Sequence, residues 1–197
     1  MRIGIITWFT GPNYGTNLQA IALQYYLRKQ GYEVELINCE VESEYSKNRR
    51  TFIEKIEFFP EKCAQKLACR VFFKKEKAIR DEKLVKTIRK NCILTRRCEA
   101  EKDLVEVFNS FDLLISGSDQ IWNTRYTHCD PVFLLKFADD SKRRVSIASS
   151  FACKKMNERY ESEFKMCLKR FNALSVREAL GLGVLSDLGI PNAYQVL

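Results

Sequence analysis

The first 38 residues carry the pattern that most constrains the fold. Residues 2–9 are rich in Ile, Thr, Trp and Phe and alternate little, which is typical of a strand buried on both faces of a parallel sheet. A helix is predicted next, ending before Gly31, because apolar residues recur at helical spacing at Leu18, Ala22, Tyr25 and Tyr26. Residues 34–37 supply a second strand. Residues 2–38 are therefore predicted to form a βαβ unit around one amphipathic helix.

The rest of the chain continues this alternation. Further strands are predicted at 111–116, 144–149 and 173–176, and from 193 onward. Helices are predicted within 48–91, with a break near Pro60, and at 103–109, 158–171 and 178–188, the last closed by Gly189. Because 197 residues fit one domain, we predict an α/β fold with one parallel sheet flanked by helices.

The excess of positive charge lies in one segment. The formal net charge is +8, and residues 41–100 hold 17 Lys and Arg against 9 Asp and Glu. These charges are mixed with apolar residues at helical spacing, so we interpret the segment as basic surface helices; docking on a membrane or on a partner is the alternative. No nucleic-acid partner is expected.

The sequence shows no export signal, and its apolar runs are far shorter than the ~20 residues of a membrane-spanning helix. We expect a cytoplasmic protein, with peripheral membrane association left open. The eight cysteines include no CxxC pair and the single histidine is His128, so free thiols are expected, with no metal site and no cofactor. His128 is interpreted as a solvated loop residue rather than an acid or base.

Function is sought in the loops after the strands, because ligands of parallel sheets bind at the carboxyl ends of the strands. The loop at 11–17 contains Asn13 and Gly15 and opens a helix, where free N–H groups favour an anion or a polar ligand. A turn chosen for its backbone geometry is the alternative. Neither a dinucleotide nor a Walker-type motif is present.

Two further loops carry candidate side chains. After the strand at 111–116, Ser118 allows close approach of a ligand, Asp119 and Gln120 can bind hydroxyls, and Trp122 can stack on a sugar ring. The alternative is a helix cap at Ser118 and a core tryptophan. Arg177 ends another strand, where its charged fork suits phosphate or carboxylate; a surface ion pair with Glu178 is the alternative. We predict that Asn13, Asp119 and Arg177 lie along one edge of the sheet.

Taken in order, these segments resemble the polysaccharide pyruvyl transferase family. The matching stretches are residues 13–15, 18–20, 22–24, 111–112, 117–120 with Trp122, 149–151, 175–178 and 188–190. The resemblance implies a Rossmann-like domain similar to one half of a two-domain, GT-B-type enzyme. It also implies transfer of the pyruvyl unit of phosphoenolpyruvate to a hydroxyl of a sugar or glycolipid acceptor, usually of a cell-surface polysaccharide.

By the same resemblance, Arg177 contacts the donor anion and Asp119 is the catalytic candidate that polarises a hydroxyl. Asn13, Gly15, Ser118, Gln120 and Trp122 would line the acceptor side. The chain ends where a second half is expected, so residues 1–197 are interpreted as the N-terminal half, inactive alone. The partner is expected to be a C-terminal half or a second copy, bound at an apolar surface near the end of the chain.

Two other functions stay open on the sequence. One half of a sugar-nucleotide glycosyltransferase has the same fold, and binding of a sugar nucleotide instead of phosphoenolpyruvate would favour it. A non-catalytic binding module, docked through residues 41–100, would instead show salt-sensitive binding to anionic vesicles.

Overall fold

The computed structural model describes residues 1–9, 13–39, 74–127 and 130–196. The part of the predicted helical segment from residue 48 to residue 73, the break near Pro60, and His128 with its neighbour Cys129 lie outside these ranges.

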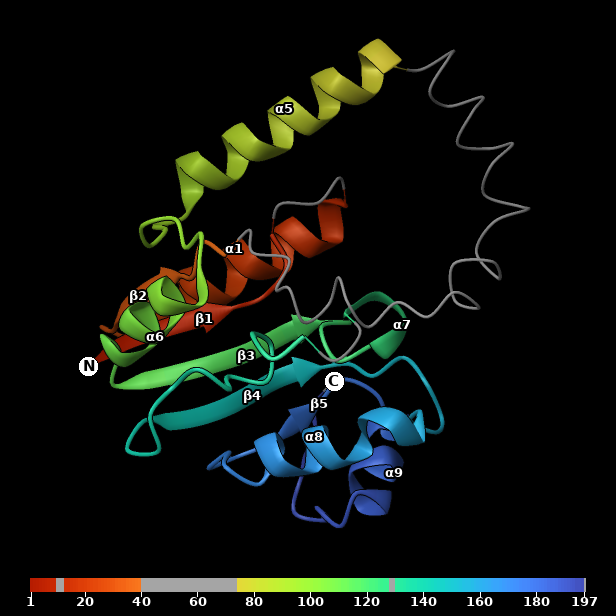
Figure 1. Ribbon diagram of the computed structural model, residues 1–197. Helices are drawn as coiled ribbons and strands as arrows, with labels where there is room; N and C mark the ends of the chain where they lie inside the picture. The colour runs from red at the N-terminus through yellow and green to blue at the C-terminus, as the bar shows by residue number, and fades with distance from the viewer. Residues whose placement is uncertain (10–12, 40–73, 128–129, 197) are drawn as a thin grey trace.

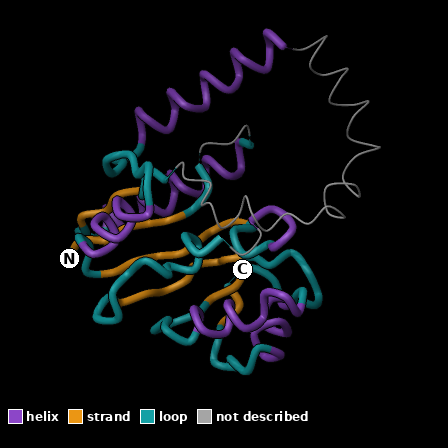
Figure 2. The backbone as a smooth tube through the Cα atoms, in the orientation of Figure 1, coloured by secondary structure: helices purple, strands orange, loops and turns teal. Residues whose placement is uncertain are grey.

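One parallel sheet forms the centre of the molecule (Figures 1 and 2), and the predicted α/β class is confirmed. Its strand order is β2-β1-β3-β4-β5-β6, and every neighbouring pair is parallel. The strands are β1 (Arg2–Ile6), β2 (Glu33–Leu36), β3 (Leu113–Asp119), β4 (Arg143–Ser149), β5 (Ser175–Val176) and β6 (Tyr194–Gln195). All predicted strands are present, and β6 confirms the one expected from residue 193.

Helices cover both faces of the sheet. The helices are α1 (Tyr14–Lys29), α5 (Lys74–Asn91), α6 (Glu101–Asn109), α7 (Thr124–Thr127), α8 (Glu158–Leu168) and α9 (Ala179–Asp187). On one face, Ile5 of β1 and Ile115 of β3 pack with α1 and with Ile88 of α5. Because neighbouring strand residues point to opposite faces, Leu114 of β3 packs on the other side, against α6. That side continues into the cluster formed by α8 and α9.

The order of the strands reverses at β1. The chain passes from β1 to β2 on one side, and from β3 it proceeds through β4, β5 and β6 on the other. The carboxyl ends of β1 and β3 are neighbours, yet their crossover connections lead away from each other on opposite faces. This arrangement is a topological switch point, where open α/β sheets form their ligand crevice.

The buried face of α1 differs from the prediction. Leu18, Tyr25 and Tyr26 are about 60% exposed, whereas Thr16, Asn17, Ala20 and Gln24 are buried. The side chain of Gln24 explains part of this reversal: its amide donates to the carbonyls of Val34 and Ile93 and accepts from the Ile93 N–H. Helix α1 thus places a polar side chain against backbone groups of Val34 and Ile93, beside Ile21, Leu23 and Leu27, which pack partly buried against the core.

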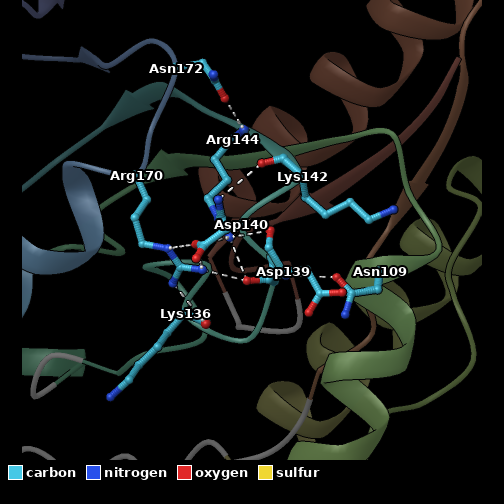
Figure 3. Close-up of polar contacts among 9 residues, drawn as sticks. Asn109, Lys136, Asp139, Asp140, Lys142, Arg144, Arg170 and Asn172 are labelled. Atoms are coloured by element: carbon cyan, nitrogen blue, oxygen red, sulfur yellow. Dashed lines mark hydrogen bonds and ion pairs between the residues drawn. The ribbon is translucent and has the colours of Figure 1, made fainter.

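A buried arginine organises the opposite, amino-terminal edge of the sheet (Figure 3). Arg144 of β4 is 1% exposed and donates to the carbonyls of Ala138, Asp139 and Lys142. Arg170 shares the Ala138 carbonyl and pairs with Asp140 at 2.7 Å. Burial, and then the neighbouring Arg170 charge, lowers the pKa of Arg144. The two guanidinium groups hold the turn before β4 in place.

Four of the described cysteines, Cys92, Cys98, Cys153 and Cys167, are free thiols, as expected. Burial raises the pKa of the Cys92 thiol to about 11 and moves those of Cys98, Cys153 and Cys167 upward. A raised pKa leaves little thiolate at neutral pH, so these thiols are structural rather than reactive.

Gly117 provides a test of how closely β3 and β4 approach. Its φ is +124°, and a Cβ added there would overlap the carbonyl oxygen of Ile147 in β4. We expect Gly117→Ala to lower the free energy of unfolding by about 3 kcal/mol, from backbone strain and overlap together. Denaturant unfolding followed by circular dichroism measures this loss.

Gly31→Ala is the matched control, because Gly31 also has a positive φ, +86°, but open space around it. It should cost only the backbone term, about 1 kcal/mol. Equal losses in the two variants would show that the overlap with Ile147 contributes nothing.

Candidate functional site

The three predicted functional loops meet at one edge of the sheet. Asp119 is the last residue of β3, and its register partner is Ser149, the last residue of β4. Arg177 follows β5 directly, and its N–H donates to the carbonyl of Ser149 at 3.2 Å. Asn13 caps α1, the helix that follows β1. The predicted shared edge is confirmed, and with one strand between β3 and β5 the Asp119 and Arg177 backbones lie roughly 10 Å apart.

Asp119 is fixed between β3 and the first turn of α1. Its Oδ2 accepts from the Thr16 hydroxyl at 2.7 Å, and its Oδ1 accepts from the Gln120 N–H at 2.7 Å. The residue is half-buried and has a φ of +102°, a backbone conformation that residues other than glycine rarely adopt. Its orientation is therefore set by the surrounding contacts, and the carboxylate lies at the switch point between β1 and β3.

Gln19 of α1 joins the two strands at this point. Its amide nitrogen lies within hydrogen-bond distance of the Thr7 hydroxyl at 3.0 Å, the Trp8 carbonyl at 3.1 Å and the Thr16 carbonyl at 2.9 Å. Its amide oxygen accepts from the Ser118 N–H at 3.2 Å. The Thr7 hydroxyl in turn donates to the Ser118 carbonyl at 2.5 Å. We call Thr7, Thr16, Gln19, Ser118 and Asp119 the switch-point network.

Three members of this network, Thr7, Thr16 and Gln19, were not predicted. A signal was present in the sequence, because Thr16 and Gln19 lie one turn apart at the start of the predicted helix, directly after the candidate loop at 11–17. Asn17, on the same helix, is also buried, and its side-chain oxygen has no hydrogen-bond partner within the described ranges.

The other predicted residues of the β1 and β3 loops have different roles in the structure. The exposed Asn13 accepts from the Gly15 N–H at 2.9 Å and so fixes the start of α1. Ser118 lies within β3 and caps no helix, and its hydroxyl donates to the carbonyl of Ala148. Gln120 accepts from the Asn123 amide at 3.1 Å.

Trp122 corrects one prediction. Its side chain is 0% exposed, its ring packs against Phe151 and Phe171, and its Nε1–H donates to the carbonyl of Phe133. An indole buried in this way offers no face to a sugar ring. Trp122 comes three residues after the end of β3 and belongs to the hydrophobic cluster that packs against α8 and α9. The structure therefore supports the alternative of a core tryptophan.

Arg177 is one-third exposed, with its Nε 3.5 Å from Oε2 of Glu178. The other oxygen of Glu178 accepts from the Ser150 hydroxyl at 2.5 Å and from the Ala152 N–H at 3.2 Å. Glu178 therefore connects the arginine to the loop after β4. The ion pair expected as the alternative exists, but it occupies only one edge of the guanidinium group, and the exposed part remains accessible to an anion.

Two surface hollows border the strands and helix α1, one at each end of the strands. One, of about 50 Å³, is lined by Thr7, Trp8, Asp130 and Phe133 at the edge that carries the site. The other, of about 610 Å³, is lined by Tyr25, Lys29, Tyr32 and Glu35, at the opposite end of α1 and far from Asp119 along the strands. We place the candidate site at the switch point because the fixed polar groups converge there. Within the described residues, no group of three or more His, Cys, Asp or Glu could hold a metal ion.

Comparison with known proteins gives one match. The family model described as "Polysaccharide pyruvyl transferase" matches residues 13–197, which include all of the candidate site except Thr7. No curated protein and no solved structure matches the chain significantly.

Replacing Gln19 tests whether the switch-point network holds α1 to the sheet. Gln19→Met keeps the length of the side chain but leaves the Ser118 N–H without its acceptor and removes the amide N–H groups that lie within hydrogen-bond distance of Thr7 and Trp8. We expect the free energy of unfolding to fall by about 2 kcal/mol, the cost of unsatisfied buried polar groups. Chemical denaturation measures it, with Gln30→Met at the exposed end of α1 as the control. Equal stability of the two variants would contradict the role of Gln19.

Proposed function

This chain belongs to the polysaccharide pyruvyl transferase family, and we propose that it takes part in transferring a pyruvyl group from phosphoenolpyruvate to a hydroxyl of a sugar or glycolipid acceptor. The observation that carries the proposal is the family match over residues 13–197. The geometry of the switch-point network and of Arg177 supports it.

The proposed reaction sets three chemical requirements. The methylene carbon of the enol gains a proton, a sugar oxygen forms a bond to the neighbouring carbon and gives up its proton, and phosphate leaves from that carbon. A second hydroxyl of the same sugar then closes a cyclic ketal. The reaction therefore needs cations for the phosphate and carboxylate of the donor, an acid for the enol carbon and a base for the hydroxyl.

Arg177 suits the donor. Its guanidinium is always charged, and its planar fork matches phosphate or carboxylate. Glu178 fixes the Nε edge of that fork, so the remaining N–H groups can bind an anion without first being ordered.

Asp119 suits the acceptor. Its two oxygens are already oriented by Thr16 and Gln120, and a carboxylate held in this way can accept a hydrogen bond from a sugar hydroxyl and take up its proton. Asn13, Gly15, Ser118 and Gln120 surround it in our proposal. The buried amide of Asn17 is a further candidate, since a ligand hydroxyl can supply the donor that its oxygen lacks within the described residues.

We also propose a cytoplasmic location for this reaction. Cys92, Cys98, Cys153 and Cys167 are free thiols, which fits a reducing compartment. Among the helices that the structure describes, none is long and apolar enough to cross a bilayer.

Binding of phosphoenolpyruvate tests the proposed donor site without requiring turnover. We expect phosphoenolpyruvate to raise the unfolding temperature of the chain, because a ligand that binds only the folded state stabilises it. Arg177→Gln should weaken binding at least about tenfold, since it removes charge-assisted hydrogen bonds. Isothermal titration calorimetry measures both dissociation constants.

Arg143→Gln is the matched control, because Arg143 is exposed at the amino-terminal end of β4, on the opposite edge of the sheet. It removes the same charge and should leave binding unchanged. Equal weakening in both variants would indicate a nonspecific charge effect. Binding of a uridine-diphosphate sugar in place of phosphoenolpyruvate would replace the proposal with the glycosyltransferase alternative.

A further inference from the structure

The outward side of α1 is apolar, which is unusual for a helix that covers a sheet. At 3.6 residues per turn, the side chains of Tyr14, Leu18, Ala22, Tyr25 and Tyr26 fall within an arc of about 120°. All five are exposed, Tyr14, Leu18, Tyr25 and Tyr26 by 59 to 62%. We call these residues the α1 stripe. A contiguous exposed apolar patch marks an interaction surface.

Cations accompany the α1 stripe. Lys29 lies on the same side of the helix, one turn beyond Tyr25, with its Nζ 5.0 Å from the centre of the Tyr25 ring. Helix α1 contains Arg28 and Lys29 but no Asp or Glu. The stripe therefore begins next to Asn13 at the candidate site and ends in positive charge.

Helix α5 adds a second basic surface on the same side of the sheet. Leu84 and Ile88 are its buried residues, and Ile88 packs in the cluster that contains Ala20 of α1. Figure 1 shows α5 beyond α1, with its Lys74 end projecting away from the body. Opposite Leu84 and Ile88, an arc of about 80° holds the exposed residues Lys75, Ile79, Lys83, Lys86 and Lys90. We call these the α5 lysine row.

The two helices carry a strong positive charge. Helix α5, within the basic segment 41–100, contains eight Lys and Arg against three Asp and Glu, and α1 adds Arg28 and Lys29, which gives +7 for the two helices together. This charge favours an anionic partner.

The residue types distinguish a bilayer from other anionic partners. Lysine is depleted at the centres of protein interfaces, where arginine is favoured, yet the cations of the α5 row are all lysines. A strongly hydrated ammonium group suits lipid headgroups, and tyrosine and leucine suit the boundary between headgroups and acyl chains.

We propose that the α1 stripe and the α5 lysine row form a peripheral docking surface for an anionic lipid bilayer. Tyr and Leu of α1 enter the interfacial layer, and the lysines of α5 contact the headgroups. The candidate site at the start of α1 then lies beside the membrane surface. This docking does not depend on the proposed pyruvyl transfer and is measured without any donor or acceptor.

Vesicle flotation tests the proposal with the full chain. We expect binding to vesicles of phosphatidylcholine and phosphatidylglycerol, and no binding to pure phosphatidylcholine. Binding should weaken, without disappearing, as salt is raised, because each lysine near an anionic surface contributes roughly a fivefold gain in partitioning. Lys75→Glu/Lys83→Glu/Lys90→Glu should reduce binding at least tenfold. Leu18→Gln/Tyr25→Gln/Tyr26→Gln should weaken the binding that remains at high salt, with glutamine keeping the helix stable.

Lys102→Glu/Lys154→Glu/Lys169→Glu is the control, because it changes the net charge equally at exposed lysines on and beside α6 and α8, which cover the other face of the sheet. It should retain most of the binding. Equal losses in the two charge variants, or no binding to anionic vesicles, would overturn the proposal. A dimer that depends on Leu18, Tyr25 and Tyr26 in light scattering, without vesicle binding, would assign the surface to a second copy instead.

Discussion

The open ends of β1 and β3 are the constraint on which the rest of the site depends. Where two neighbouring parallel strands send their connections to opposite faces, no crossover covers the last backbone groups of either strand. In this protein the first turns of α1 contact both strand ends: the Gln19 amide accepts from the Ser118 N–H and donates toward the Trp8 carbonyl. In the next contact the Thr16 hydroxyl donates to Asp119 and orients the carboxylate proposed to act on the acceptor.

The contacts of α1 with the sheet determine which of its side chains are buried and which are exposed. Helix α1 faces the sheet with both kinds of side chain: Thr16, Asn17 and Gln24 are buried, and Ile21, Leu23 and Leu27 pack partly buried against the core. Its three tyrosines and Leu18 lie outside, where they form a surface that a bilayer can cover. One local requirement, the need for polar groups at the switch point, thus connects the candidate site to the proposed docking surface.

At the opposite, amino-terminal edge of the sheet, backbone carbonyls are satisfied by a charged side chain instead of an amide. Arg144 is buried beside Arg170, and burial alone would disfavour its cation. The carbonyls of Ala138, Asp139 and Lys142 compensate by accepting its N–H groups. This fixes the turn that starts β4, the strand whose far end pairs with Asp119 and supports Arg177.

The sequence by itself determined the order of the elements, because hydrophobic periodicity and glycines such as Gly31 and Gly189 act locally. It also determined the common edge of Asn13, Asp119 and Arg177, since parallel strands bring their carboxyl ends together. Only the tertiary structure decided that α1 buries Thr16, Asn17 and Gln24 and that Trp122 enters the core. Those outcomes depend on which backbone groups lack partners and on which space remains to be filled, and both are set by residues such as Ile93 and Phe151 that are distant in the sequence.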